Sequence, residues 1–225
     1  TAGQSSGTTG KCLVMVTQDA ERTMNTFLGA SDTLSFNEID KDSLKNSEWF
    51  YVEGYLMTDK ARTVIIKEAV EFARANGVKI AISLSDSSVV DIFGDALRDV
   101  IGDGVELIFS NKDEALAFAG SDNVNIAMED LKQITKTFVI TDGVNGAITY
   151  DGKSVFRSEG FSVKAIDTNG AGDMFAGAFL YAITSGKGYV WASGLANYCA
   201  SRVVEKFGPR LESEEFGIIN DKFGI

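Results

Sequence analysis

Residues 167–173 of this chain read Asp-Thr-Asn-Gly-Ala-Gly-Asp and run into the apolar segment Met-Phe-Ala-Gly-Ala-Phe at 174–179. Small residues let a ligand approach the backbone closely. A helix that starts here presents unpaired N–H groups and the positive end of its dipole, which together favour an anion. We therefore expect Gly170, Ala171 and Gly172 to form an anion site. Asp173, in the first helical turn, is expected to supply a carboxylate that deprotonates a substrate hydroxyl.

Strand and helix patterns alternate along the chain before this stretch. Apolar runs predict strands, and apolar residues every three or four positions predict helices. The predicted strands are 12–17, 26–30, 49–54, 78–84, 105–110 and 137–141, and the predicted helices are 60–76, 89–100, 111–119 and one ending before 136. A hairpin at 145–150 and 154–156 turns at Asp151-Gly152, and long helices are expected at 171–185 and 189–206. The alternation predicts an α/β fold with crossover connections and a mostly parallel sheet.

The bulk composition limits the classes of function. The 225 residues carry a formal charge of −11, which opposes binding to a phosphate backbone, so nucleic acid is not an expected partner. The absence of histidine excludes Ser-His hydrolysis and histidine-ligated zinc. No apolar run reaches the length of a membrane span, and Cys12 and Cys199 lie in apolar contexts that predict buried thiols. These features predict a cytoplasmic protein with no membrane partner.

The string at 167–173 has two interpretations when it is taken alone. Its glycines also fit a simple tight turn, with Asp173 complementing the helix dipole. The whole string, however, is similar to the signature Asp-Thr-x-Gly-Ala-Gly-Asp of the ribokinase-like (PfkB) kinases of carbohydrates and nucleosides, and the segment at 174–179 matches as well. A motif of this length between a strand and a helix is specific. The resemblance extends from residue 11 to about 211 and corresponds to the family's C-terminal two-thirds.

The resemblance implies a ribokinase-like three-layer α/β/α fold with a mostly parallel central sheet, whose N-terminal portion and lid are missing or incomplete. Residues 1–30 would be a remnant of the lid-proximal, substrate-side strands, and 31–225 the α/β nucleotide-binding and catalytic domain. The implied activity is ATP-dependent phosphoryl transfer to a hydroxyl of a small sugar or sugar derivative, with Mg²⁺ as a second cofactor. Asp173 resembles the catalytic base. Asp167 and Thr168 resemble positions at a monovalent-cation site, and the use of K⁺ is left open.

A second matching element is Asn-Lys-Asp-Glu at 111–114, which follows a predicted strand. It resembles the family's Asn-x-x-Glu element beside magnesium and phosphates. Asn111 is then expected in the ATP site, and Glu114 is expected to reach Mg²⁺ through water. Asparagine followed three residues later by glutamate also fits a capping box, which needs no ligand. The two roles are compatible.

Three further segments match the family more weakly. Residues 141–146 resemble its strand-to-hairpin element bordering the nucleotide, which implicates Thr141, Gly143 and Gly146, against the alternative of a plain Asp-Gly turn. Asn197 resembles a position near the adenine ring, against the alternative of a solvated helix residue. Glu21 falls where relatives carry a glutamate that reaches the sugar, against the alternative of a solvent-facing charge.

Other functions stay open at this stage. Within the family, an adenosine- or inosine-type nucleoside kinase is the alternative to a sugar kinase, since such kinases share the motif. For both kinds of kinase the resemblance also leaves open a homodimer formed through the missing lid. A dinucleotide-binding oxidoreductase also uses a glycine-rich turn, but its glycines should follow the first strand. An inactive protein on the same fold is the third alternative, against which Asp173 argues. The Walker-type phosphate loop is absent from the sequence.

Overall fold

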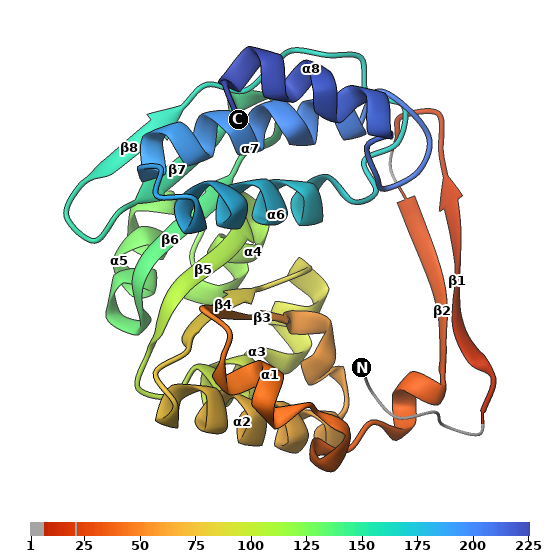
Figure 1. Ribbon diagram of the computed structural model, residues 1–225, viewed down its shortest axis with the longest axis vertical. Helices are drawn as coiled ribbons and strands as arrows, with labels where there is room; N and C mark the ends of the chain where they lie inside the picture. The colour runs from red at the N-terminus through yellow and green to blue at the C-terminus, as the bar shows by residue number, and fades with distance from the viewer. Residues whose placement is uncertain (1–6, 21) are drawn as a thin grey trace. The chain divides into compact units, whose positions relative to one another are not determined.

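The computed structural model describes residues 7–20 and 22–225, which divide into two compact units (Figure 1). The first unit consists of the described residues that fall within Thr1–Lys11, Thr26–Ile140 and Tyr150–Lys153. The second takes its residues from Cys12–Asn25, Thr141–Thr149 and Ser154–Ile225. The boundary expected at residue 30 divides the chain by function, with substrate-side strands before it and the nucleotide-binding domain after it, whereas the two units are defined by their internal contacts. The functional boundary stays a prediction.

The first unit is built on strands that lie in the order β3-β4-β5-β6. Their bounds are β3 Trp49–Glu53, β4 Lys79–Ser83, β5 Val105–Asn111 and β6 Thr135–Thr141, of which only Thr141 belongs to the second unit. β3 is parallel to β4, with Trp49 opposite Lys79, and β4 is parallel to β5, with Ala81 opposite Leu107. Consecutive residues of β4 are buried, so the sheet is covered on both faces there. This is the pattern of a parallel α/β sheet.

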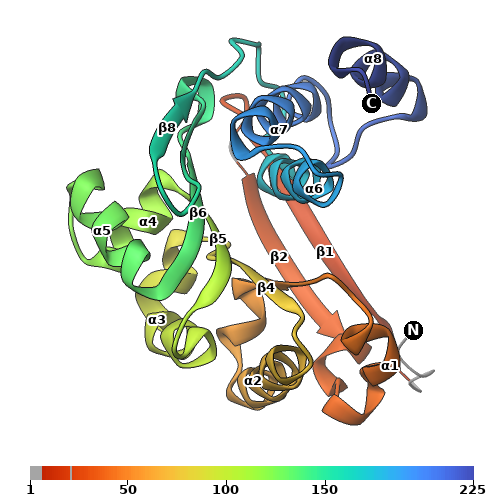
Figure 2. The same cartoon turned by 60° about the vertical axis from the view of Figure 1, so that its left-hand side comes forward.

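Helices connect the strands of the first unit. They are α1 Lys41–Lys45, α2 Lys60–Ala75, α3 Ser87–Ile101, α4 Lys112–Ala119 and α5 Val124–Ile134, with short 3-10 helices at Ala30–Thr33, Phe36–Glu38 and Gly54–Thr58. α2, α3, α4 and α5 pack one against the next, as Figure 2 shows. α2 begins after Asp59, whose side chain accepts a hydrogen bond from the Arg62 amide, and it ends before Gly77, whose φ of 75° suits the end of a helix.

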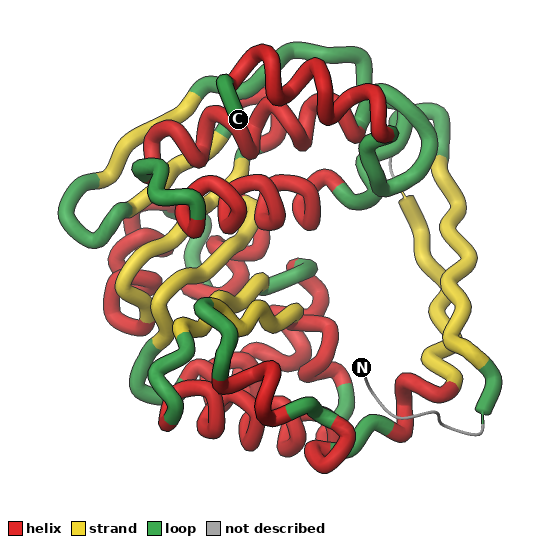
Figure 3. Tube along the Cα trace, viewed as in Figure 1, coloured by secondary structure: helices red, strands yellow, loops and turns green. Residues whose placement is uncertain are grey.

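The second unit holds the C-terminal helices α6 Ala171–Thr184, α7 Tyr189–Val203 and α8 Ser213–Phe223. α6 and α7 run side by side, and α7 also packs on strand β8 (Figure 3). β8 (Val155–Ser158) follows β7 (Ala147–Tyr150) after a turn in which Gly152 has a φ of 92°. Such a short turn joins antiparallel strands, so the predicted hairpin is confirmed. A 3-10 helix, η4 (Gly143–Asn145), precedes β7.

Strands β1 (Thr9–Val16) and β2 (Arg22–Gly29) pair with each other in a separate two-stranded sheet. Each strand belongs partly to the first unit and partly to the second. Large apolar side chains on these strands are exposed, including Leu13 at 65% and Phe27 at 58%. The sheet therefore carries apolar surface that the described residues do not cover.

Most of the predicted elements are confirmed, with boundaries that differ by a few residues. The sequence did not reveal α1, which is too short for a helical period, or α8, whose N-cap is Glu212, a residue type uncommon at that position. None of the helices in the described ranges combines the length and the apolar composition that crossing a bilayer takes.

The prediction that both thiols are buried is confirmed for Cys199 and wrong for Cys12. Cys199 is buried in α7, but Cys12 is exposed on β1. An apolar context predicts burial only where another layer covers the strand, and much of the surface of the β1–β2 sheet stays exposed. Burial raises the pKa of the Cys199 thiol to about 11.

At pH 8 we expect a thiol reagent to label native protein at Cys12 only, with Cys199 reacting after unfolding. The thiolate is the reactive form, and a thiol with a pKa of about 11 is ionised in roughly one molecule in a thousand at this pH. Colorimetric thiol counting with and without guanidinium measures this, and Cys12→Ser should show no native labelling. Two rapidly labelled thiols in the native protein would contradict the buried position of Cys199.

Candidate active site

Helix α6 begins at Gly170, which can only be glycine. Gly170 is the N-cap residue and has a left-handed backbone, with φ of 77°. A Cβ atom at this position would lie 2.5 Å from Pro209 Cβ and 2.6 Å from the Pro209 carbonyl oxygen. Both the positive φ and the close approach of Pro209 exclude a side chain, so they fix where the helix starts.

The first amides of α6 are available to a ligand. The Ala171 amide donates to the Thr168 carbonyl at 3.3 Å, and the first helical bond runs from Met174 N to Gly170 O at 2.9 Å. The amides of Gly172 and Asp173 thus have no acceptor within the helix. Within the described ranges, nothing lies within 4 Å of where a Gly172 Cβ would stand, and the Asp173 side chain is exposed. The first turn of α6 thus holds two unpaired amides, those of Gly172 and Asp173, together with the exposed Asp173 side chain.

Asp167 anchors the segment that leads into α6. Its carboxylate is 3% exposed and accepts hydrogen bonds from Asn169 N at 2.9 Å and from Gly208 N at 3.0 Å. The Ile166 amide donates to the Val204 carbonyl at 2.7 Å, so a second backbone contact joins the same two segments. Both of these hydrogen bonds to the buried carboxylate come from neutral backbone amides.

Thr168 connects α6 to the β1–β2 turn. Its hydroxyl donates to the Ala20 carbonyl at 3.0 Å and accepts from Arg22 Nη1 at 3.2 Å. Arg22 Nε is buried without a hydrogen-bond partner among the described residues. Sequence reasoning missed Arg22, because a single arginine in a polar turn gives no signal and its partner is 146 positions away. Its neighbour Glu21, the predicted sugar contact, lies outside the described residues.

In the first unit, Asn111 and Glu114 form a complete capping box at the start of α4. Glu114 accepts from Asn111 N at 2.9 Å and from Asn111 Nδ2 at 2.7 Å, and its own amide donates to Asn111 Oδ1 at 2.8 Å. Asn111 is exposed and Glu114 is buried. The box fixes a carboxylate at the carboxyl end of β5, the edge at which open α/β sheets bind ligands.

Thr141, the last residue of β6, and the loop that follows it with Gly143 and Gly146 belong to the second unit. The Asp142 amide donates to the Gly146 carbonyl at 2.8 Å and closes the loop. Gly143 is exposed, with φ of 54°, whereas Gly146 is buried, with φ of 85°. Gly143 therefore presents backbone to solvent, and Gly146 faces neighbouring backbone.

Asn197 in α7 is 7% exposed, so the alternative of a solvated helix residue is wrong. Its side-chain amide donates to Ser158 Oγ at 2.9 Å and to the Glu159 carbonyl at 3.2 Å. Of the predicted site residues, the second unit holds 141–146, 167–173 and Asn197, and the first unit holds Asn111 and Glu114.

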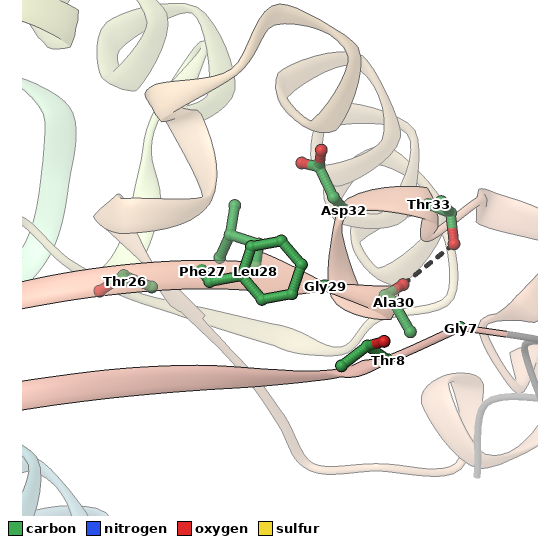
Figure 4. Close-up of a pocket in the computed structure, with 9 residues that line it drawn as sticks. All are labelled: Gly7, Thr8, Thr26, Phe27, Leu28, Gly29, Ala30, Asp32 and Thr33. Carbon is green, nitrogen blue, oxygen red and sulfur yellow. Dashed lines mark hydrogen bonds between the residues drawn. The ribbon is translucent and has the colours of Figure 1, made fainter.

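A cavity of about 390 Å³ lies in the first unit beside the ends of β1 and β2 (Figure 4). Phe27 and Leu28 give it an apolar wall, and Thr8 and Asp32 add polar groups. Asp32 is held by Arg62 Nη1 at 2.5 Å. The cavity is open to solvent rather than enclosed, so it does not by itself indicate a ligand site. Nothing in the local sequence indicated it, since its lining comes from two strand ends and a 3-10 helix.

A family model, related sequences and solved structures that resemble this chain all describe kinases. A family model described as pfkB family carbohydrate kinase matches residues 3–215. Adenosine kinase of Saccharomyces cerevisiae is 28% identical over 222 residues, covering 92% of this chain and 64% of its own length. The crystal structure of adenosine kinase from Sinorhizobium meliloti has a TM-score of 0.90 at 31% identity, covering 95% of this chain and 66% of that chain. The crystal structure of a probable sugar kinase from Rhizobium etli CFN 42 has a TM-score of 0.88 at 29% identity, covering 95% of this chain and 66% of that chain.

These likenesses confirm the predicted α/β, ribokinase-like fold. The chain spans less than two thirds of the length of the yeast adenosine kinase that it matches. The matched residues include every predicted site residue.

We expect Asn111→Ala and Glu114→Ala each to lower the free energy of unfolding by roughly 1–2 kcal/mol, because each removes the capping box. The double variant should cost less than the sum of the two single variants, because both single variants already lose the hydrogen bond from Asn111 Nδ2 to Glu114 Oε1. Denaturant unfolding measures all three. Asp113→Ala, in the same turn but outside the box, is the control and should stay within about 0.5 kcal/mol of wild type. Full additivity of the two single effects would contradict a shared network.

Proposed function

Because this chain belongs to the pfkB family of carbohydrate kinases, we propose that it carries the nucleotide-binding and catalytic part of an ATP-dependent kinase that phosphorylates a hydroxyl of a small sugar, sugar derivative or nucleoside. The observation that carries this proposal is the start of α6, where open amides adjoin the exposed Asp173 carboxylate. In phosphoryl transfer, a protein contributes mainly by positioning the reacting groups and by stabilising negative charge. The start of α6 offers both.

The proposed roles of the residues follow from their chemistry. Asp173 accepts the proton of the attacking hydroxyl, a role open to a carboxylate in a chain without histidine. Of the predicted anion site, Gly172 together with the neighbouring Asp173 supplies unpaired amides that stabilise charge on the transferred group, whereas Gly170 sets the start of the helix and the Ala171 amide is bonded to the Thr168 carbonyl. Arg22 adds a fixed positive charge that is bonded to Thr168. An anionic ligand would also supply an acceptor for the buried Arg22 Nε, which is why we assign this arginine to the site although sequence analysis did not.

ATP and Mg²⁺ are the proposed cofactors. Among the described residues, no three His, Cys, Asp or Glu side chains lie close enough together to hold a metal ion. Mg²⁺ does not need such a group, because it keeps several waters and binds through one or two carboxylates together with substrate phosphates. We assign the carboxylate to Glu114 through water, and the ATP contacts to Asn111, Thr141, Gly143 and Gly146. Magnesium would neutralise charge on the phosphates.

A monovalent cation such as K⁺ is a further proposal, resting mainly on Asp167. Its carboxylate is buried and bonded to neutral amides, so a nearby cation would compensate its charge. The Thr168 hydroxyl, the second residue proposed for this site, is bonded to Ala20 and Arg22 in the structure.

The proposed acceptor is a hydroxyl of a small sugar, a sugar derivative or a nucleoside. The similar proteins include adenosine kinases and a probable sugar kinase, and both substrate classes present a hydroxyl on a sugar ring. We propose that Glu21 and the strands before residue 30 lie on the substrate side. A lid-mediated homodimer is proposed because β1 and β2 expose Leu13, Met15 and Phe27. A cytoplasmic location is proposed because ATP is the phosphoryl donor.

The direct test of this function is calorimetric titration of the chain with ADP and Mg²⁺, alongside NAD. Micromolar to millimolar binding of ADP without binding of NAD supports the kinase over the oxidoreductase. A panel of ribose, fructose, adenosine and inosine in an ATP-consumption assay of the full-length protein then identifies the acceptor. Binding of NAD but not ADP would overturn the proposal.

Asp173→Asn is expected to lower kcat in the full-length protein by about a hundredfold or more, because a positioned general base typically contributes that factor. Affinity for ADP should change by no more than a few-fold, since the side chain acts on the acceptor. Steady-state kinetics and calorimetry measure the two quantities, and an unchanged melting temperature shows that the substitution is not structural. Wild-type turnover would remove Asp173 from the role of base.

Gly172→Ala is expected to keep or raise stability while lowering kcat by roughly a hundredfold. The helix has room for the added methyl group, and alanine favours a helix over glycine, but the methyl group lies where the transferred phosphoryl group would sit. Gly177→Ala is the matched control, because it lies in the same helix with equally open space and outside the site. Melting curves and kinetics separate the effects. Equal, wild-type turnover in both variants would contradict an anion hole at Gly172.

A further inference from the structure

Two glycines bring separate backbone segments of the second unit into direct contact. A Cβ atom on Gly146 would lie 1.9 Å from Ser158 O and 2.6 Å from Gly160 N. A Cβ atom on Gly160 would lie 2.4 Å from Val144 O. Neither position has room for a side chain, so the loop after β6 rests directly on the end of β8 and on the residues that follow it.

Asn197 holds this supporting segment from the side of α7. Its amide donates to Ser158 Oγ and to the Glu159 carbonyl, the two residues immediately before Gly160. Ser158 Oγ in turn donates to the Ala147 carbonyl at 3.4 Å, next to Gly146. A chain of contacts therefore runs from α7 through 158–160 to the loop 142–146. Asn197 is buried, so these hydrogen bonds compensate the cost of removing its amide from water.

A second polar contact of α7 provides an internal comparison. Ser193, one helical turn before Asn197, lies 2.9 Å from Thr149, hydroxyl to hydroxyl, and both side chains are completely buried. This contact attaches α7 to the middle of β7, away from the loop. Asn197 and Ser193 thus share a helix, a partner hairpin and buried positions, but only Asn197 supports the loop.

We infer that Asn197 is a positioning residue for nucleotide binding, which acts through Ser158, Glu159 and Gly160 on the loop that follows Thr141 and carries Gly143. The inference rests on the proposed function, because that function makes this loop a nucleotide contact. It assigns to Asn197 a role other than touching the adenine ring, since both its donors are directed at 158–159. Without the amide, the support behind Gly146 is free to shift, and the loop loses the single conformation that binds nucleotide.

The test compares Asn197→Leu, Ser158→Ala and the control Ser193→Ala by calorimetry with ADP and with inosine diphosphate, each with Mg²⁺. Asn197→Leu is expected to weaken both nucleotides by the same factor, roughly tenfold, the scale of a lost buried hydrogen bond. Ser158→Ala should act in the same direction, and it covers the case in which Asn197→Leu fails to fold. Ser193→Ala should lower the melting temperature and leave both affinities within about twofold of wild type.

Hydrogen exchange without nucleotide gives a second readout. The Gly146 amide, bonded to the Gly143 carbonyl at 3.1 Å, should exchange faster in Asn197→Leu and Ser158→Ala than in Ser193→Ala. The inference is overturned if the exchange rate of the Gly146 amide or the nucleotide affinities stay unchanged in Asn197→Leu and Ser158→Ala. It is also overturned if only the affinity for ADP falls, because that result would indicate direct contact of Asn197 with adenine. If wild type binds neither nucleotide, the proposed function fails while the exchange comparison still tests the support of the loop.

Discussion

The close approach of Gly170 to Pro209 is the constraint on which the rest of the second unit depends. It requires a residue without a side chain in a left-handed conformation, and it thereby fixes the point at which α6 starts. The amides of the first turn, the carboxylate of Asp173 and the bond from Ala171 to Thr168 all follow from that starting point. Asp167 supports the same arrangement, since its buried carboxylate binds Gly208, beside Pro209, as well as Asn169.

Backbone groups held by glycines and buried polar side chains form much of the candidate site. Gly143 and Gly172 present exposed backbone, whereas Gly146 and Gly170 are buried and press against neighbouring backbone. The side chains that support these segments, Asp167 and Asn197, are buried and donate to or accept from main-chain atoms. These contacts hold the backbone groups in place, and donors fixed in place are what electrostatic stabilisation of a transferring phosphoryl group requires.

The features predicted from sequence are those determined over short distances along the chain. The stretch at 167–173 predicted its own turn and helix start, and the capping box of Asn111 and Glu114 was evident from a spacing of three residues. The features that were missed depend on distant partners. Arg22 meets Thr168 across 146 positions, and Asn197 meets Ser158 across 39, so neither partner is encoded nearby. Cys12 was expected to be buried because its neighbours are apolar, but burial depends on a covering layer that local composition does not specify.

The central claim, that the start of α6 receives the phosphoryl group to be transferred, is tested most directly by the backbone amide chemical shifts of the chain with two ligands. One sample contains ADP with Mg²⁺, and the other contains a non-hydrolysable ATP analogue with Mg²⁺, so the two differ only in the terminal phosphate. The account predicts that the largest shift differences between the samples fall on the amides of Gly172 and Asp173, the donors of the first helical turn that have no acceptor within the helix. Saturable binding of both ligands with no difference at these amides would contradict it.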